Sequence, residues 1–430
     1  MNTQLKNSEE TLVFPAQPFT LSKYYPWTIV LLCSFFLFYK YILQVSPSVM
    51  TQDLMRNFHV TGAGLGNLAA TFFYAYLVTQ IIAGLLLDRL SPRYLTTLAI
   101  GSAAVGSLIF ANSHSLTTAA LSRALMGAGA AFATVSYMKM SALWFRQNKV
   151  AFVDGLLATA AMIGAMCGQI PLTALVNTVG WRESMLYCGL LGTLLAFLFF
   201  IFVKDKKEPI LYDVHVPPAP KLRGLFTLLK SKKNWLLTFY SGLAFTPVAV
   251  LGGLWGNPFF EESHHLTNET AAFFTSLIFL GLAVGGPLFG FFADRLGNRI
   301  KVMSYGSGLA FMALMLALYV LNLPLWLFGC LLFLFGLGSG AFMLSYPLGK
   351  ELNQHLGLAA TVVALINTGD AFFGSFTEPL IGKVLDFFWQ GKIVAGVHYF
   401  SVTDYDKALL ILPVYLLSAL GCLLLLKRLD

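Results

Sequence analysis

Long apolar runs, separated by short polar connections, form the dominant pattern along the chain. A run of about 20 apolar residues is long enough for an α-helix to cross a hydrocarbon core about 30 Å thick. Helices are expected because backbone groups in lipid must find their hydrogen bonds within the segment. The pattern predicts twelve membrane-spanning helices, at residues 25–48, 63–87, 94–112, 117–143, 151–175, 183–203, 234–256, 270–292, 302–321, 325–348, 358–384 and 407–426.

Composition supports a polytopic membrane protein. Hydrophobic residues make up 57% of the chain and charged residues 11%, whereas a soluble domain carries about 25% charged residues. The sequence has no ATP-binding motif, and its five cysteines lie within apolar runs without metal-ligand spacing. We interpret Glu261, Glu262, His264 and His265 as polar loop residues rather than metal ligands. We therefore expect neither an enzyme nor a bound cofactor or metal.

The positions of Lys and Arg predict the orientation. With a cytoplasmic N-terminus, 20 of the 28 basic residues fall on cytoplasmic segments, so the positive-inside rule places both chain termini in the cytoplasm. Residues 204–233 hold eight of these basic residues and four prolines. We interpret this segment as a cytoplasmic linker, whose prolines argue against a helix and whose charges lie against anionic headgroups. It separates an N-terminal six-helix half, residues 1–203, from a C-terminal six-helix half, residues 234–430. The net charge of +8 then needs no nucleic-acid partner.

A ten-residue motif occurs twice, 206 positions apart, each time between the second and third spans of its half. A repeat at about half of the chain length indicates duplicated halves. A carboxylate beside arginines can pair with them and can face a helix N-terminus, although the arginines alone would suffice as a topological anchor. The first copy contains Gly84, Asp88, Arg89 and Arg93, and the second contains Gly290, Asp294, Arg295 and Arg299.

These features resemble the major facilitator superfamily of secondary transporters. The resemblance rests on the two halves, the basic central segment and the Gly-x-x-x-Asp-Arg-x-x-x-Arg motif, and it extends to Arg123-Ala-Leu-Met-Gly127-Ala-Gly129 in the fourth span. It implies an all-α polytopic fold of twelve helices in two pseudo-symmetric six-helix bundles. It also implies alternating access, with the motif copies latching the inner side closed. The first copy departs from the family pattern, because Ser91 replaces the usual glycine.

Two basic residues lie well within spans of the N-terminal half. An ionisable residue at the bilayer centre costs at least about 2.5–3.5 kcal/mol and usually faces a cavity. Lys40 lies in the first span, where the aromatic Tyr39 and the polar Gln44 are expected to be neighbours of its ammonium group. We interpret it as a substrate or coupling contact, the alternative being a lysine paired with a carboxylate for packing. Arg123 can fork onto a carboxylate or phosphate, and a purely structural arginine is the alternative.

Two carboxylates lie in the eleventh span. Asp370 and Glu378 are eight residues apart, so they fall near one helix face about 12 Å apart along the axis, with Gly374 between them. Burial in low dielectric lets a carboxylate exchange protons near neutral pH. Asp370, the deeper residue, is the predicted proton or cation site. Glu378 is either an outer gate residue or a residue near the interface before Pro379.

Aromatic and amide residues are expected to complete a central cavity. For Trp255, a place in the interfacial aromatic belt is the favoured alternative. The candidates are Tyr74, Gln80, Tyr137, Gln169, Trp255 and Asn257.

Together these features predict a secondary active transporter. Lys40 and Arg123 favour an anionic group, and a proton moving inward with the substrate can neutralise Asp370. We expect proton-coupled uptake of a small organic anion or zwitterion, such as a carboxylate, an amino acid, a short peptide or a carboxylate siderophore. The alternative is proton-driven export of a metabolite or amphipathic drug. We further expect a monomer in a bacterial inner membrane, whose partners are lipid, protons and a small-molecule substrate.

Overall fold

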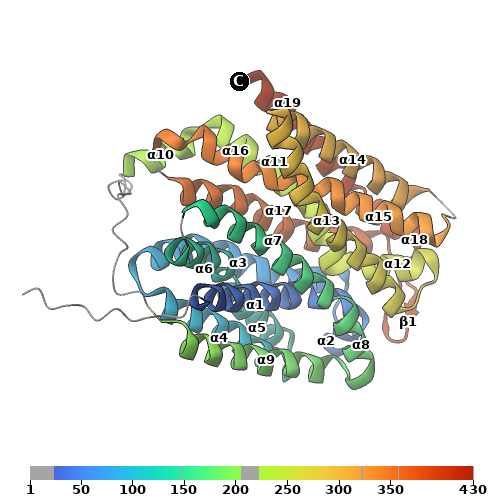
Figure 1. Cartoon of the computed structure of the whole chain (residues 1–430). Coiled ribbons are helices and arrows are strands. Elements are labelled where there is room, and N and C mark those ends of the chain that lie inside the picture. Colours follow the sequence, from blue (N-terminus) through green and yellow to red (C-terminus); the bar gives the residue numbers. More distant parts are fainter. Residues whose placement is uncertain (1–23, 146, 205–221, 321–322, 357, 430) are drawn as a thin grey trace, which may run out of the picture.

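The computed structural model describes residues 24–145, 147–204, 222–320, 323–356 and 358–429. The chain forms helices along nearly all of this length (Figure 1). The elements up to residue 202 are α1 (Tyr25–Val45), η1 (Ser46–Val49), α2 (Thr51–Phe58), α3 (Gly62–Arg89), α4 (Pro92–Ala111), α5 (Leu116–Ala130), α6 (Phe132–Trp144), α7 (Gln147–Cys167), α8 (Ile170–Val179) and α9 (Trp181–Phe202).

The elements after residue 221 are also helical, apart from one short hairpin. They are α10 (Leu222–Lys230), α11 (Lys232–Val250), η2 (Leu251–Trp255), α12 (Gly256–His264), α13 (Asn268–Leu296), α14 (Arg299–Tyr319), α15 (Leu325–Ser339), η3 (Gly340–Leu344), α16 (Ser345–Leu352), η4 (Gln354–Leu356), α17 (Ala359–Phe388), β1 (Ile393–Val394), β2 (Val397–His398), α18 (Val402–Leu409) and α19 (Ile411–Leu429).

Ten helical stretches among the described residues are long and apolar enough to cross a membrane. They coincide with ten of the twelve predicted spans, several of which combine two or three consecutive helices. The second and eleventh predicted spans correspond to α3 and α17, which are 28 and 30 residues long but are not among these ten stretches. The polytopic all-α class is thus confirmed, and the count of twelve spans stays a prediction.

The segment between the predicted halves differs in part from expectation. Residues 205–221, which contain all four prolines of the predicted linker, lie outside the described residues. Residues Leu222–Lys230 form α10. The sequence had not predicted a helix in this part of the linker. The prolines end before it, so nothing in its sequence interrupts the backbone hydrogen bonds of a helix.

The helices lie in two groups. In Figure 1 the blue to green helices α1–α9 lie together below the yellow to red helices α11–α19. Matching glycines allow close packing within each group. Gly127 of α5 lies directly against the backbone of Phe72 in α3, and Gly336 of α15 lies in the same way against Ile278 in α13. A side chain at either glycine would separate these helices, so small residues are required at both positions.

The two groups meet most extensively where α17 packs along α3. Gly66 of α3 lies against the main chain of Glu378 and Pro379, and Gly382 of α17 lies against Gly62. Contacts between η1 and η2 and between α7 and α13 extend the junction. Helix α17 therefore presents its residues to the N-terminal group along much of its length.

Candidate functional site

Asp370 of α17 is the centre of a buried polar cluster. Its side chain is 7% exposed. The Ser241 hydroxyl of α11 donates a 2.7 Å hydrogen bond to Oδ1, and the Tyr346 hydroxyl of α16 donates a 2.8 Å bond to Oδ2. The Tyr346 hydroxyl is also 3.4 Å from Oδ1 of Asn367, one turn earlier in α17. Each oxygen of this carboxylate thus accepts a bond from a hydroxyl donor.

Lys40 of α1 approaches the cluster from the other group of helices. Its side chain is 5% exposed, and its charge and that of Asp370 act on each other. Its Nζ lies 3.7 Å from the ring centre of Tyr41 and 5.2 Å from that of Tyr76 in α3. An ammonium over aromatic faces is stabilised by the ring quadrupoles without a direct carboxylate contact. We call Lys40 and Asp370 the lower couple.

Arg123 of α5 and Glu378 of α17 form a second pairing across the junction, which we call the upper couple. They are 1% and 2% exposed, and their charges act on each other. The guanidinium donates a 2.6 Å hydrogen bond to the carbonyl of Leu43 and a 3.4 Å bond to that of Ala69. It also lies 5.1 Å from the ring centre of Phe72. Among the described residues, Arg123 Nε and Glu378 Oε2 have no hydrogen-bond partner.

The spacing along α17 places both carboxylates at this junction. Eight residues are little more than two helical turns, so Asp370 and Glu378 project toward the same neighbouring helices. The sequence placed two acids in the eleventh span and two bases in spans of the N-terminal half, but it predicted no pairing between them. The sequence did not reveal which acid faces which base, because that depends on the offset between α17, α1 and α5.

The structure places the other predicted cavity residues in different surroundings. Tyr39 packs against Gly192 of α9, and the hydroxyl of Tyr137 donates a 2.7 Å bond to the carbonyl of Val153 in α7. Gln44 is buried, and its Oε1 has no partner among the described residues. Tyr39 and Tyr137 therefore pack within the N-terminal group, whereas Lys40, Arg123, Asp370 and Glu378 face the junction.

Trp255 is buried at the end of η2, and its indole N–H donates a 3.1 Å bond to the main-chain carbonyl of Glu378. The interfacial-belt alternative is therefore wrong for this residue. Sequence reasoning missed Tyr76 and Tyr346, which enclose the lower couple. It selected Tyr74 instead, which is 41% exposed and bonds to Asn67 of its own helix. Every tyrosine within an apolar run looks alike in the sequence, so the sequence alone could not tell which of them lie at the site.

A network of buried amides joins the two groups beyond the upper couple. Gln169, at the break between α7 and α8, donates to Ser48 Oγ at 2.9 Å and to the Gly252 carbonyl at 2.6 Å. Asn257 donates a 3.0 Å bond to Gln169 Oε1 and accepts a 2.5 Å bond from Thr275. Gly252 belongs to η2, which is a π-helix. Such single-turn π segments are rare and often accompany functional sites. We call this part of the bundle the Gln169 end.

A second connection at the Gln169 end comes from Asp386, near the C-terminus of α17. Its two carboxylate oxygens accept bonds of 2.9 and 2.7 Å from the backbone N–H groups of Gly62 and Ala63. These are the first amides of α3, where the helix dipole favours a negative charge. His398 Nδ1 lies 3.6 Å from the same carboxylate, and Asn268 of α13 donates a 3.2 Å bond to the carbonyl of Val49. These contacts close the Gln169 end.

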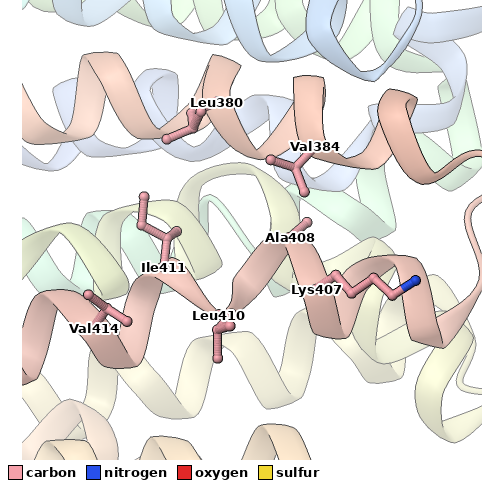
Figure 2. A pocket seen from close by; sticks show the side chains of 7 residues that line it. All are labelled: Leu380, Val384, Lys407, Ala408, Leu410, Ile411 and Val414. Carbon is pink, nitrogen blue, oxygen red and sulfur yellow. The ribbon is translucent and has the colours of Figure 1, made fainter.

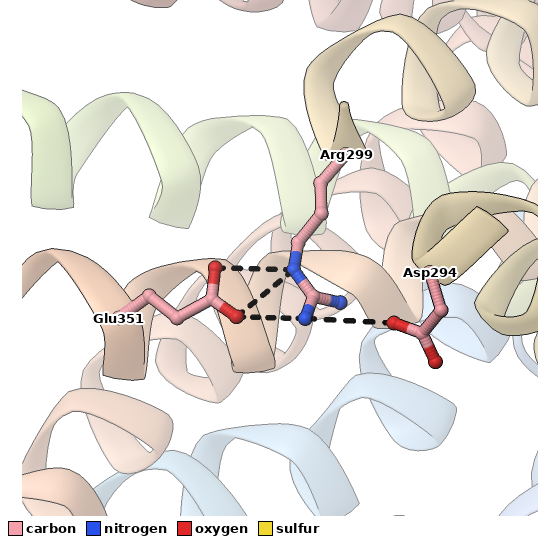
Figure 3. Close-up of polar contacts among 3 residues, drawn as sticks. All are labelled: Asp294, Arg299 and Glu351. Atoms are coloured by element: carbon pink, nitrogen blue, oxygen red, sulfur yellow. Dashed lines mark hydrogen bonds and ion pairs between the residues drawn. The ribbon is translucent and has the colours of Figure 1, made fainter. Parts of the chain in front are cut away.

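The repeated motif lies at the opposite end of the bundle, and its two last arginines have different partners. Arg299 makes a bidentate contact with Glu351 of α16, with distances of 2.7–3.1 Å, and lies 3.7 Å from Asp294 (Figure 3). Arg93 instead donates bonds of 3.0 and 2.6 Å to the carbonyl of Phe200 in α9. Both arginines tie the start of their helix to a neighbour within the same group.

The remaining motif residues are less engaged. Arg295 is exposed, and a Cβ at Gly84 or Gly290 would meet no neighbouring atom within 4 Å. The side chains of Asp88 and Arg89 lie outside the described part of the structure.

The departure at Ser91 has a backbone explanation. In the second copy, Gly297 ends α13 with φ of +63°, which is the left-handed conformation that favours glycine. In the first copy, Ser91 has φ of −58° and precedes α4 as its N-cap residue. Because no positive φ is needed there, serine is tolerated.

A groove lies between α17 and the break that separates α18 from α19 (Figure 2). It has a volume of about 270 Å³, and its one charged side chain is Lys407. It offers few polar groups to orient a polar substrate. Among the described residues, no group of three or more His, Cys, Asp or Glu side chains is placed to hold a metal ion. The lining is Leu380, Val384, Lys407, Ala408, Leu410, Ile411 and Val414.

Comparison with known proteins gives a consistent result. The family model of the Major Facilitator Superfamily matches residues 27–377. An uncharacterized transporter of Bacillus subtilis (strain 168), YybO, is 25% identical over 299 residues, which are 64% of this chain and 68% of that protein. A probable hexose phosphate transport protein of Chlamydia pneumoniae is 22% identical over 428 residues, 91% of this chain and 92% of that protein.

The fold also resembles solved structures. A bacterial homologue of the human lysosomal transporter Spinster, solved in an inward-facing and unoccupied conformation, has a TM-score of 0.76 to this chain. The two share 15% sequence identity over 95% of this chain and 98% of that structure. At this identity the likeness concerns the fold alone.

Proposed function

The chain belongs to the Major Facilitator Superfamily, and from that premise we propose that it takes up a small organic anion or zwitterion together with a proton. It is a secondary transporter embedded in the membrane. In this proposal residues 1–203 and 234–430 are two halves that rock about the α3–α17 junction. The lower couple carries the proposal, because a lysine of one group and an aspartate of the other are both buried, the lysine near two tyrosine rings and the aspartate with two hydroxyl donors.

Lys40 supplies the attraction for the anionic group. Two tyrosine rings lie near its ammonium group, and no carboxylate among the described residues forms an ion pair with it. A substrate carboxylate or phosphate can therefore approach the ammonium without first breaking a direct ion pair, whose loss would oppose binding. The Chlamydia relative is named for a phosphorylated, hence anionic, substrate. A carboxylate, an amino acid, a short peptide and a carboxylate siderophore share this chemistry.

Asp370 and Glu378 supply the coupling. Both are buried acids on α17, and each faces a basic residue of the other group. A proton on either acid removes a charge from the junction, so it changes the attraction between the groups. Protonation and substrate binding can thereby be linked through the same contact surface.

The positive-inside rule supports an orientation with both termini in the cytoplasm of a bacterial cell. In that orientation the Gln169 end is the outer end. Because Gln169, Asn257 and Asp386 join the groups there, the present conformation is closed to the outside. The motif copies then lie on the cytoplasmic side, where Arg299 and Glu351 would stabilise one conformation of the C-terminal half.

Export is the second candidate. The acidic and aromatic surroundings of Asp370, with Tyr41, Tyr76 and Tyr346, would also suit an amphipathic cation. An inward proton gradient would then drive a metabolite or drug out of the cell. Import and export involve the same residues. An imported anion would bind Lys40, whereas an exported cation would bind Asp370.

The test is transport by proteoliposomes that contain the full chain. Labelled citrate, L-glutamate, L-alanine, dialanine and glucose 6-phosphate would be offered with and without an inside-alkaline pH gradient. We expect gradient-driven accumulation of at least one compound, and its loss in Lys40→Ala. Lys301→Ala, on the surface of α14, is the matched control. Gradient-driven expulsion would favour export. Binding without any flux would indicate a receptor and contradict transport.

A further inference from the structure

The two acids of α17 differ in how the protein solvates them. Both oxygens of Asp370 accept hydrogen bonds from hydroxyl donors, Ser241 and Tyr346. Glu378 Oε2 is buried and has no partner among the described residues. Hydrogen bonds from donors stabilise the ionised form of a carboxylate, whereas burial without donors favours the neutral acid. On geometry alone, Glu378 is therefore the acid that gains more from taking up a proton.

The partner of Glu378 is built to tolerate the loss of that negative charge. Arg123 already donates to the carbonyls of Leu43 and Ala69 and lies over the ring of Phe72. These contacts hold the guanidinium in place whether or not Glu378 is ionised. An ionised Glu378 attracts Arg123 across the junction, and a neutral Glu378 does not. Protonation at this site thus weakens one contact between the groups without displacing its basic member.

Glu378 also lies beside the segment that closes the Gln169 end. The indole of Trp255 donates to the main-chain carbonyl of Glu378, and a Cβ added to Gly253 would lie 3.5 Å from Glu378 Oε1. Gly252, the neighbouring residue in η2, accepts the hydrogen bond from Gln169. The π-helical segment therefore touches Glu378 on one side and the amide network on the other. Opening of the Gln169 end must move groups that lie against this carboxylate.

We infer that Glu378 carries the transported proton, with Arg123 as its fixed counter-charge, whereas Asp370 stays ionised and Lys40 binds the anionic group of the substrate. This division of roles rests on the proposed function. An O–H bond forms at Glu378 when a proton arrives from the Gln169 end, and it breaks when that proton passes to water on the opposite side. Among the described residues, Tyr74 of α3 is a further titratable group that acts on Glu378, and it contributes a neutral phenol.

The first test needs no substrate. Infrared difference spectra of the full chain in lipid vesicles would be recorded from acid to alkaline pH, following the C=O stretching band of a protonated carboxylic acid. We expect a titrating band in the wild type and in Asp370→Asn, and its loss in Glu378→Gln. Glu183→Gln, an exposed carboxylate of α9, is the matched control and should leave the band unchanged. A band lost in Asp370→Asn but kept in Glu378→Gln would overturn the assignment, as would no band in the wild type.

The second test uses whichever compound of the transport panel accumulates. Glu378→Gln should lower gradient-driven accumulation at least tenfold while keeping exchange of labelled for unlabelled compound without a gradient. Asp370→Asn should lower both. Glu378→Asp should restore part of the accumulation, which separates proton carriage from a folding defect. Exchange lost together with accumulation in Glu378→Gln would contradict the assignment. If no compound is transported, the proposed function fails, and the infrared spectra still decide the proton site.

Discussion

The upper and lower couples use the same charges at the same junction but differ in how the charges are satisfied. In the lower couple the acid is well solvated by Ser241 and Tyr346, and the base rests on aromatic rings. In the upper couple the base is well solvated by backbone carbonyls, and one oxygen of the acid has no described partner. Burying a charge is tolerated when hydrogen bonds replace water. The member with those bonds is the one expected to stay ionised.

This contrast explains why two pairs of similar composition can have separate roles. Among the residues that the structure describes, no carboxylate forms an ion pair with Lys40, so Lys40 is available to a ligand. Glu378 lacks a full set of donors, so it is available to a proton. The five predictions below test the contrast, from the largest expected effect to the smallest.

Loss of Arg123 should have the largest effect on stability. Arg123→Met removes a buried cation that three structural contacts hold, and it leaves the carbonyls of Leu43 and Ala69 without their donor. We expect a loss of about 3–5 kcal/mol in the free energy of unfolding, measured by denaturation of the purified protein in detergent. Arg295→Met, at an exposed position of the repeated motif, should cost less than about 0.5 kcal/mol. Equal losses of unfolding free energy in the two variants would contradict a stabilising role for the buried contacts of Arg123.

Loss of Lys40 should act mainly on binding. Lys40→Ala leaves a substrate anion without its buried counter-charge, which costs at least about 2 kcal/mol, or roughly 30-fold in affinity. Isothermal titration with the transported compound measures it.

The double variant Lys40→Ala with Asp370→Asn tests whether the lower couple acts as a pair. If the two charges interact, the combined loss of stability should be smaller than the sum of the single losses. Additive losses would mean that each charge acts alone.

Tyr346→Phe should weaken the stabilisation of the Asp370 carboxylate by removing one hydroxyl donor. A hydrogen bond to a charged group contributes about 1.5–3 kcal/mol, so we expect lower stability and poorer substrate exchange. Tyr74→Phe is the matched control, because the described hydrogen-bond partner of its hydroxyl is Asn67, on a partly exposed face. An unchanged exchange rate in Tyr346→Phe would contradict a role of the Tyr346 hydroxyl in the lower couple.

Loss of an exposed ion pair should have the smallest effect on stability. Comparison with the buried charges then measures how much burial strengthens such an interaction. Glu351→Gln breaks the bidentate contact with Arg299. The side chain of Glu351 is 45% exposed and that of Arg299 is 23% exposed. Solvent screens such pairs, so the cost to unfolding free energy should be at most about 1 kcal/mol and should shrink further at high salt. A larger, salt-independent loss would indicate that this contact is not an ordinary surface pair.

Much of the fold followed from the hydrophobic pattern, because the bilayer accepts few alternatives to long helices. Ten predicted spans coincide with helical stretches able to cross a membrane, and the four buried charges were recognised as costly residues. The helix α10 was not expected, because residues 204–233 contain four prolines, which disfavour helices. All four lie at or before residue 220, whereas α10 begins at Leu222. Short helices such as α2 and α10 cannot be inferred from span length.

The details of the site were harder to predict. Trp255 was a candidate for the cavity with the interfacial belt as the favoured alternative, and it is buried against α17. Tyr39, adjacent to Lys40 in sequence, packs toward α9, whereas Tyr76 from another helix lies near the ammonium. Neighbours along a helix point about 100° apart, so proximity in sequence does not imply a shared cavity.

The sequence by itself determined the membrane-spanning class, the duplicated motif and the presence of two acids in the eleventh span and of two bases within spans of the other half. These features depend on hydrophobicity and helical periodicity, which are local properties. The tertiary structure alone decided which acid faces which base and which hydroxyls reach Asp370. It also decided which atoms of Arg123 and Glu378 have no described partner. Such choices depend on how helices distant in the chain are offset against one another, and glycine contacts such as Gly66 against Glu378 set that offset.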